Sequence, residues 1–298
     1  IDGDLVAVSM ATGEVAWYIP WSEEYWSGHP VVADGLVLAA TDRARAYEAA
    51  TGVERWSIPL PSSAIHHVSA TANGVWYLGV GNEVWALDVQ TGAERWRQTF
   101  AGTDPYAARA RTLAVAGDGV YVCGEQVLEA NGARTQGPVV AMDAATGAVR
   151  WRHIMRFAEE YNYCVDAPLV TADAVVLADY ASNNVVALER ASGAPRWHFR
   201  GEFGWYGSRA TPVLRGDTVY VASADKNVRA LSLQTGTAIW ETEFDGSFRH
   251  VANCGAVLLA NNLSLHVIDP RTGAVLARDI AAHWPLGHIP STPPVVIG

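Results

Sequence analysis

The feature that most constrains the fold is a repeat built around a small turn and a tryptophan. A Thr-Gly or Ser-Gly dipeptide recurs at intervals of 37 to 55 residues, with its glycine at Gly13, Gly52, Gly92, Gly147, Gly193, Gly236 and Gly273. A tryptophan stands four residues after six of these glycines, at Trp17, Trp56, Trp96, Trp151, Trp197 and Trp240, whereas the seventh copy has Ala277. Half of the 12 tryptophans therefore occupy one position of one repeat.

Each copy has the pattern of four short strands, which we name A to D in chain order. A turn dipeptide such as Asn73-Gly74 opens an apolar strand B, and a polar turn leads to an alternating strand C that ends at Thr-Gly. The glycine suits a turn position with positive φ, and strand D follows it. A Pro-Val-Val segment before the unit supplies strand A. Four short strands in about 40 to 45 residues are typical of one blade of a β-propeller.

Seven copies predict an all-β fold, a single seven-bladed propeller domain over residues 1–298 with four-stranded antiparallel blades. The two chain ends together make one repeat period, so we expect both termini to close the last blade and remove exposed sheet edges. That blade is shorter than the others by about one strand, strand B. Either this strand is missing from the chain or the closing blade has three strands. The start of the chain at an apparent strand C favours the first alternative.

Composition narrows the classes of protein further. The chain has 298 residues, 50% of them hydrophobic and 17% charged, which excludes a disordered, collagenous or coiled-coil protein. A formal net charge of −10 argues against nucleic-acid binding, and no apolar run approaches the roughly 18 residues needed to span a membrane. All but one of the basic residues are arginine, which together with abundant alanine indicates a GC-rich bacterial genome.

The three cysteines are too few for a disulfide framework. Cys123 ends a strand B and Cys164 lies in the next D–A loop, so a bridge between these two stays open. Cys254 is expected to be a buried free thiol.

The pattern hydrophobic-x-Ala-Leu-Asp-x-x-Thr-Gly-x-x-x-Trp resembles the tryptophan-docking repeat of the pyrroloquinoline-quinone-like (PQQ-like) propellers. It stands here as Val84-Trp85-Ala86-Leu87-Asp88 with Thr91, Gly92 and Trp96, and again over 139–151. The resemblance covers essentially the whole chain. It implies that the six tryptophans of the repeat pack between neighbouring blades as structural residues, each burying roughly 200 Å².

The resemblance is less specific for function. Its members include quinoprotein dehydrogenases, a lipoprotein of the outer-membrane barrel assembly machinery and sensor domains of bacterial protein kinases. The dehydrogenases have eight blades, a vicinal cysteine disulfide and a calcium site of Glu, Asn and Asp. This chain has seven copies and no Cys-Cys pair, which argues against a PQQ cofactor and against quinone-dependent oxidation. The assembly lipoprotein also has eight blades, so the resemblance stays at the level of the superfamily.

The copies differ mainly on the face that carries the D–A and B–C loops. The A–B and C–D turns are short and uniform, whereas the D–A loops vary and one B–C loop carries an insertion over 125–138. Because strand A lines the central channel of a propeller, polar residues just before it should converge on the channel mouth. They are His29, His66, His67, Arg109, Arg111, Tyr163, Asp166, Arg209, Arg249, His250 and His288, with Trp205 and other aromatic and acidic residues farther out.

Three interpretations of this mouth remain open. The polar groups could only solvate the channel and satisfy one another, or bind an anionic or sugar-like ligand or a protein segment. The histidines could alternatively form a His/Arg/Tyr-based lyase or metal-dependent enzyme. Arginines are poor neighbours for a cationic metal, so we expect no metal, and we find no HExxH, GxSxG, phosphate-loop or CxxC motif. We therefore favour a non-catalytic recognition or scaffold propeller, periplasmic or on the bacterial cell surface, that binds an anionic ligand or protein partner.

Overall fold

The computed structural model describes residues 4–20, 30–61, 68–100, 109–124, 127–128, 134–135, 137–154, 167–178, 184–201, 211–223, 225–246, 248, 250–261 and 264–278. The chain divides into two compact units. The first comprises residues 1–127 and 138–152, and the second comprises residues 128–137 and 153–298. Every regular element in the described ranges is a β-strand.

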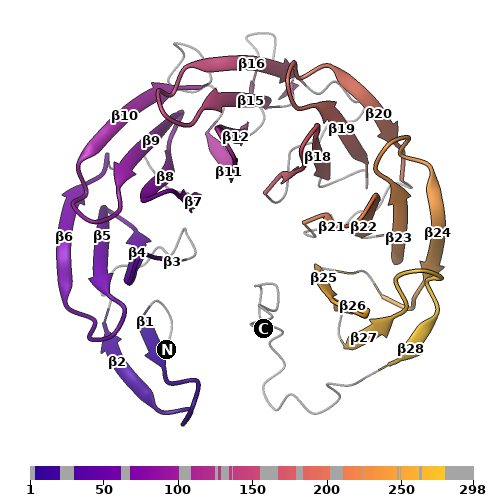
Figure 1. Cartoon of the computed structure of the whole chain (residues 1–298), viewed down its shortest axis with the longest axis horizontal. Coiled ribbons are helices and arrows are strands. Elements are labelled where there is room, and N and C mark those ends of the chain that lie inside the picture. The colour runs from indigo at the N-terminus through magenta and orange to yellow at the C-terminus, as the bar shows by residue number, and fades with distance from the viewer. Residues whose placement is uncertain are drawn as a thin grey trace. The chain divides into compact units, whose positions relative to one another are not determined.

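The first unit contains a two-stranded sheet and three four-stranded blades, all antiparallel (Figure 1). The two-stranded sheet pairs β1 (Leu5–Val8) with β2 (Val15–Ile19). The blades are β3 (Val31–Ala33), β4 (Leu36–Ala40), β5 (Arg43–Glu48) and β6 (Glu54–Pro59); β7 (Ser69–Ala72), β8 (Val75–Val80), β9 (Glu83–Asp88) and β10 (Glu94–Thr99); and β11 (Ala110–Ala116), β12 (Gly119–Gly124), β15 (Pro138–Asp143) and β16 (Val149–Ile154).

The second unit contains three further four-stranded blades. They are β17 (Leu169–Val170), β18 (Ala174–Ala178), β19 (Val185–Glu189) and β20 (Pro195–Phe199); β21 (Val213–Arg215), β22 (Thr218–Ala222), β23 (Asn227–Ser232) and β24 (Ala238–Glu243); and β25 (His250–Cys254), β26 (Val257–Asn261), β27 (Leu265–Ile268) and β28 (Val275–Ala277). A small hairpin of β13 (Val127–Leu128) and β14 (Arg134–Thr135) lies in the predicted B–C insertion.

Every predicted copy forms blade strands. Six copies are complete A–B–C–D sheets, and β1 and β2 are strands C and D of the copy that contains Gly13. The prediction of a seven-bladed, all-β fold is confirmed. The expected closure of the last blade by both termini falls partly on residues 279–298, outside the described residues.

The strands differ in burial according to their place in the blade. Strands B and C are buried over most of their length, as in β8, where all of Val75–Val80 is buried. Both faces of such a strand are covered because neighbouring sheets pack on each side, which explains why these strands are continuously apolar. Strand D alternates instead, and in β10 Trp96 is buried between exposed neighbours.

The tryptophans of the repeat join neighbouring blades within each unit. The Nε1–H of Trp56 donates to the carbonyl of Val89 at 2.9 Å, and that of Trp96 donates to Ala144 at 2.9 Å. Both acceptors lie in the C–D turn of the following blade. The same bond recurs from Trp17 to Ala49, from Trp197 to Leu233 and from Trp240 to Pro270, at 2.7–3.0 Å. Trp151 is buried beside Tyr121, with ring centroids 6.2 Å apart.

The indole ring also lies against the glycine of that same turn. A Cβ placed on Gly92 would come within 2.6 Å of the Trp56 ring, and one on Gly147 within 2.6 Å of the Trp96 ring. These glycines also have φ of +70° and +74°. Glycine is therefore required twice, once for the left-handed backbone and once for the approach of the indole.

A carboxylate–arginine lock holds the C–D turn to strand D in four blades. The carboxylate of Asp143 accepts hydrogen bonds from the backbone N–H of Thr146 and from the Arg150 guanidinium, the latter at 2.7 Å. Arg150 also binds Asp118 of the A–B turn at 2.7 Å. Equivalent pairs join Asp88 with Arg95, Glu48 with Arg55, and Glu189 with Arg196. The lock therefore ties two turns and one strand together at one end of a blade.

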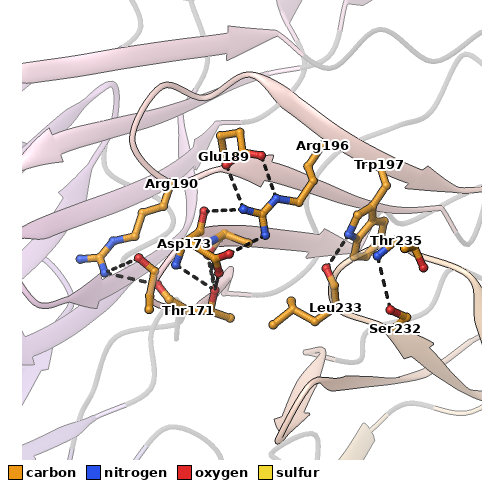
Figure 2. A network of polar contacts seen from close by, with 11 residues as sticks. Thr171, Asp173, Glu189, Arg190, Arg196, Trp197, Ser232, Leu233 and Thr235 are labelled. Carbon is orange, nitrogen blue, oxygen red and sulfur yellow. Dashed lines mark hydrogen bonds and ion pairs between the residues drawn. The ribbon is translucent and has the colours of Figure 1, made fainter.

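Figure 2 shows this lock in the second unit. The Arg196 guanidinium makes two parallel hydrogen bonds to Glu189, at 2.8 and 2.9 Å, and contacts Asp173 of the A–B turn at 2.9 Å. The next residue, Trp197, reaches across to the Leu233 carbonyl of the following blade. Adjacent side chains of strand D thus fix the turns of their own blade and the contact with the next one.

Substituting Gly92 by alanine should destabilise the protein more than the same change at Gly13. Both occupy the turn of the repeat with similar φ, but no described atom lies within 4 Å of a Cβ at Gly13. Gly13→Ala should therefore cost about 1–2 kcal/mol for the backbone alone. Gly92→Ala should cost about 1–3 kcal/mol more, because Trp56 must move. Chemical denaturation measures the difference, and equal losses for the two variants would contradict the docking role.

The carboxylate–arginine lock should make the free energy of unfolding depend on pH in the acidic range. Hydrogen bonds from Arg150 and Thr146 lower the pKa of Asp143 from 3.8 to about 2. A carboxylate whose pKa is lower in the folded state adds stability above pH 3.8 and loses it as the pH falls through about 2. Asp143→Asn should therefore flatten the fall of the unfolding free energy between pH 4 and 2. Asp245→Asn is the control, since the exposed Asp245 has no hydrogen-bonding partner among the described residues. Identical pH profiles for wild type and Asp143→Asn would refute the assignment.

Candidate functional site

The start of strand A and the B–C turns lie at the same end of the blades, which we call the B–C end. In the first unit, the backbone N–H of Ala110, at the start of β11, donates to Gly81 in the β8–β9 turn at 2.8 Å. The N–H of Phe100, after β10, donates to Asn82 in the same turn at 3.1 Å. In the second unit, Phe244 after β24 donates to Lys226 in the β22–β23 turn. Side chains just before strand A are therefore presented at this end.

Two of the predicted site residues, Arg109 and Arg111, are described at this end with their side chains. Arg109 is exposed directly before β11, and no described residue accepts a hydrogen bond from its guanidinium. Arg111 lies in β11, where Ala110 pairs with Gly124 and Thr112 with Cys123, so Arg111 is the extra residue of a β-bulge. A bulge locally redirects a side chain, and Arg111 is partly buried here.

The position of these arginines depends on a glycine of the preceding blade. A Cβ on Gly79 in β8 would approach the Ala110 Cβ to 2.7 Å and the Val68 Cγ2 to 2.9 Å. The Gly79 N–H also donates to the Val68 carbonyl at 2.8 Å. The missing side chain at Gly79 therefore lets the start of β11 pack closely on β8, which places Arg109 beside the β8–β9 turn.

Of the other predicted site residues, only the backbone of His250 belongs to the described part of the chain. His29, His66, His67, Tyr163, Asp166, Trp205, Arg209, Arg249 and His288 lie outside the described residues. His250 is the first residue of β25, where its backbone pairs with Asn261. The described part of the predicted mouth thus consists of Arg109 and Arg111, with His250 placed by its backbone.

Two other arginines at the B–C end are satisfied within their own blades. Arg45 in β5 donates to Thr41 at 2.8 Å and to Asp42 at 3.0 Å, both in the adjacent turn. Partial burial raises the pKa of Asp42, but the hydrogen bonds from Thr41 and Arg45 outweigh that and hold it below its usual value. Arg45 and Asp42 therefore support the turn and are occupied by each other.

Arg229 in β23 forms the more deeply buried pair of this kind. Its side chain is 3% exposed and contacts Asp225 and Glu241 at 2.7 Å each. Burial opposes its charge, yet hydrogen bonds to Asp225 and Glu241 outweigh burial and raise the pKa of Arg229. The sequence pattern alone did not single out this pair. The spacing of four residues between Asp225 and Arg229 was the available signal.

The His, Cys, Asp and Glu side chains of the described part of the chain bear on the metal and thiol alternatives. No group of three or more His, Cys, Asp or Glu side chains there could hold a metal ion. Cys123 is fully buried and disulfide-bonded, and Cys254 is a partly buried free thiol, whereas Cys164 lies outside the described residues. No helix with the length and apolarity of a membrane span occurs in the described ranges.

The antiparallel four-stranded blades with tryptophans bonded to the following turn define a β-propeller of the PQQ-like repeat superfamily. The family described as outer membrane protein assembly factor BamB matches residues 2–162 and 135–283. Because these two matches together cover most of the sequence, the chain belongs to this family.

The chain is similar in sequence to two curated relatives and in structure to one solved protein. The serine/threonine-protein kinase AfsK of Streptomyces griseus is 29% identical over 274 residues, covering 76% of this chain and 32% of the kinase. BamB of Moranella endobia is 28% identical over 160 residues, covering 53% of this chain and 39% of that protein. The chain thus spans about a third of the length of these relatives. The crystal structure of BamB from Moraxella catarrhalis aligns with a TM-score of 0.68 at 19% identity, covering 93% of this chain and 85% of that chain.

Breaking the Arg229 pair should be costly, whereas breaking the Arg45 pair should not. Arg229→Leu leaves the 5% exposed Asp225 without its partner, and such a loss costs about 3–5 kcal/mol. Arg45→Leu removes the equivalent side chain of β5, whose partner Asp42 is 47% exposed, and should cost about 0–1 kcal/mol. Urea denaturation of the two variants provides the comparison. A loss below 1 kcal/mol for Arg229→Leu would show that the pair is not structural.

Proposed function

We propose that residues 1–298 form one propeller domain that works as a non-catalytic recognition module and binds an anionic ligand or a protein segment at the B–C end. The observation that carries this proposal is the state of the arginines there. Arg45 and Arg229 are neutralised inside their own blades, while the exposed Arg109 contacts no described acceptor. A guanidinium without an acceptor among the described residues is a candidate for binding a ligand.

Arginine suits this role because its planar group offers paired donors to a carboxylate or phosphate. Arg109 and Arg111 lie two residues apart at the start of one strand, and Arg111 is the extra residue of the bulge there. The bulge allows both side chains to serve one end of the blade. His29, His66, His67, Tyr163, Asp166, Trp205, Arg209, Arg249, His250 and His288 are proposed to complete the same site.

The comparisons support recognition over catalysis. One relative is named an assembly factor, and the other is a kinase about three times as long as the matched region, so the shared part is a module of a larger protein. We propose that this shared module supplies contacts with a partner or ligand in each case.

We propose an extracytoplasmic, bacterial location for the domain. Cys123 is disulfide-bonded, and structural disulfides persist chiefly in oxidising compartments such as the periplasm and the cell surface. The family description names an assembly factor of outer membrane proteins. These two observations are independent of each other.

Binding of fluorescein-labelled hexaglutamate, followed by fluorescence anisotropy, tests the proposed site. Arg109→Ala should weaken binding by about tenfold, the loss expected for one charged hydrogen bond, and binding should fall steeply with added NaCl. Arg152→Ala is the matched control, because Arg152 is an exposed arginine of strand D in the same blade with no described partner. Equal affinity of wild type and Arg109→Ala, or no binding by the wild type, would overturn the proposed anion site.

A further inference from the structure

The second unit contains a groove between its last two blades that no part of the recognition proposal uses. It lies at the end of the blades opposite the B–C end, beside the β21–β22 and β27–β28 turns, and has a volume of about 570 Å³. Its lining residues include Arg215, Tyr220, Ile239, Trp240, Pro270 and Arg271. Two arginines therefore share one groove with an apolar and aromatic wall.

The aromatic wall is fixed by hydrogen bonds. The Tyr220 hydroxyl and the Trp240 Nε1–H both donate to the Pro270 carbonyl, each at 3.0 Å, and the two rings lie 5.9 Å apart. The polar atoms of both rings are thus engaged by one carbonyl, and both residues line the groove. The wall is thus preformed.

The first unit has a corresponding groove, and the two grooves differ in how their charged lining residues are paired. That groove has a volume of about 370 Å³, and Tyr77 and Trp96 donate to the Ala144 carbonyl in the same way. Its charged lining residues are paired, since Arg95 binds Asp88 at 2.7 Å and Asp143 binds Arg150 at 2.7 Å. The first groove is therefore internally neutralised.

The second groove lacks this neutralisation because the repeat departs from its pattern at four positions. Ile239 replaces the arginine before the tryptophan, and Leu276 replaces the arginine that would bind Asp269. Arg215 and Arg271 stand where the blades of the first groove have Ala72 and Ala145. The repeat thus loses arginines at Ile239 and Leu276, and it gains arginines that line the groove at positions 215 and 271.

Among the described residues, the guanidinium of Arg215 has no hydrogen-bonding or ion-pair partner. Its Nη1 atom is buried, and the described lining of the groove contains no carboxylate. The nearby acids are Asp217, which is exposed, and Asp269, whose Oδ1 accepts the backbone N–H of Arg271 at 2.8 Å. A buried charged donor without an acceptor is unfavourable, and a carboxylate from outside would satisfy it.

We propose that this groove is a second binding site for a carboxylate attached to an apolar or aromatic group. Arg215 and Arg271 bind the carboxylate, and Ile239 and the Trp240 ring hold the apolar part. Two sources share this chemistry: an acidic side chain beside an aromatic residue in a partner protein, and a free aromatic acid. The site is independent of the B–C end and of Arg109.

Ligand-observed NMR titration with 3-phenylpropionate, and with the peptide acetyl-Phe-Glu-Phe-Glu-amide, tests this site. We expect both to bind the wild-type chain, and we expect 3-phenylpropanamide and the matching glutamine peptide to bind at least tenfold more weakly. Arg215→Gln and Arg271→Gln should each weaken binding of the acids at least tenfold. Ile239→Glu should do the same, because it supplies a competing carboxylate at a position that is 55% exposed and tolerates the change.

Two controls separate this site from the proposed function. Arg152→Gln and Arg109→Ala should leave the affinity for 3-phenylpropionate unchanged. Tighter binding of the peptide would identify a partner protein as the source, and tighter binding of 3-phenylpropionate would identify a free acid. Absence of binding by the wild type, or binding that survives both Arg215→Gln and Ile239→Glu, would overturn the second site whatever the result for hexaglutamate.

Discussion

The contact between a tryptophan indole and the glycine of the next blade's turn supports the rest of this structure. Trp56 on Gly92 and Trp96 on Gly147 join neighbouring sheets through a buried ring and a hydrogen bond to a turn carbonyl. A sheet that is apolar on both faces needs such neighbours, because strands such as Val75–Val80 would otherwise be exposed to water. Each blade therefore depends on the one beside it, and the turn must stay in place for the ring to reach it.

The carboxylate–arginine lock serves the same turn from its solvent side. Asp143 binds its own turn and Arg150, and Arg150 continues to the A–B turn through Asp118. Arginine is thus used in two ways in this chain. In the lock, and in the buried pair of Arg229 with Asp225, its charge is matched within the blade. At Arg109 and at Arg215 no described residue supplies an acceptor, and these positions are where binding is proposed.

The repeat predicted the blades well because its two requirements are local. A glycine with positive φ between strands C and D, and a tryptophan four residues later, can both be read from the chain. All six complete sheets have this glycine, and five of them have the tryptophan, whereas the last has Ala277. The candidate site was harder to predict. Arg111 was expected in the loop just before strand A, yet it lies within β11, in a bulge that depends on pairing with β12. The Arg215 groove was missed because Arg215 and Arg271 are 56 residues apart and meet through two different turns.

The sequence by itself determined the fold class, the number of blades and the residues that join them. These follow from hydrophobic patterning, turn chemistry and the period of the repeat, all of which act over a few tens of residues. Only the tertiary structure decided which arginines are occupied and which are available. The sequence contains the same guanidinium at Arg95, Arg229 and Arg215, but its state depends on whether a carboxylate from another strand or turn lies within hydrogen-bonding distance. That distance is set by how the blades pack, because electrostatic pairing acts through space and not along the chain.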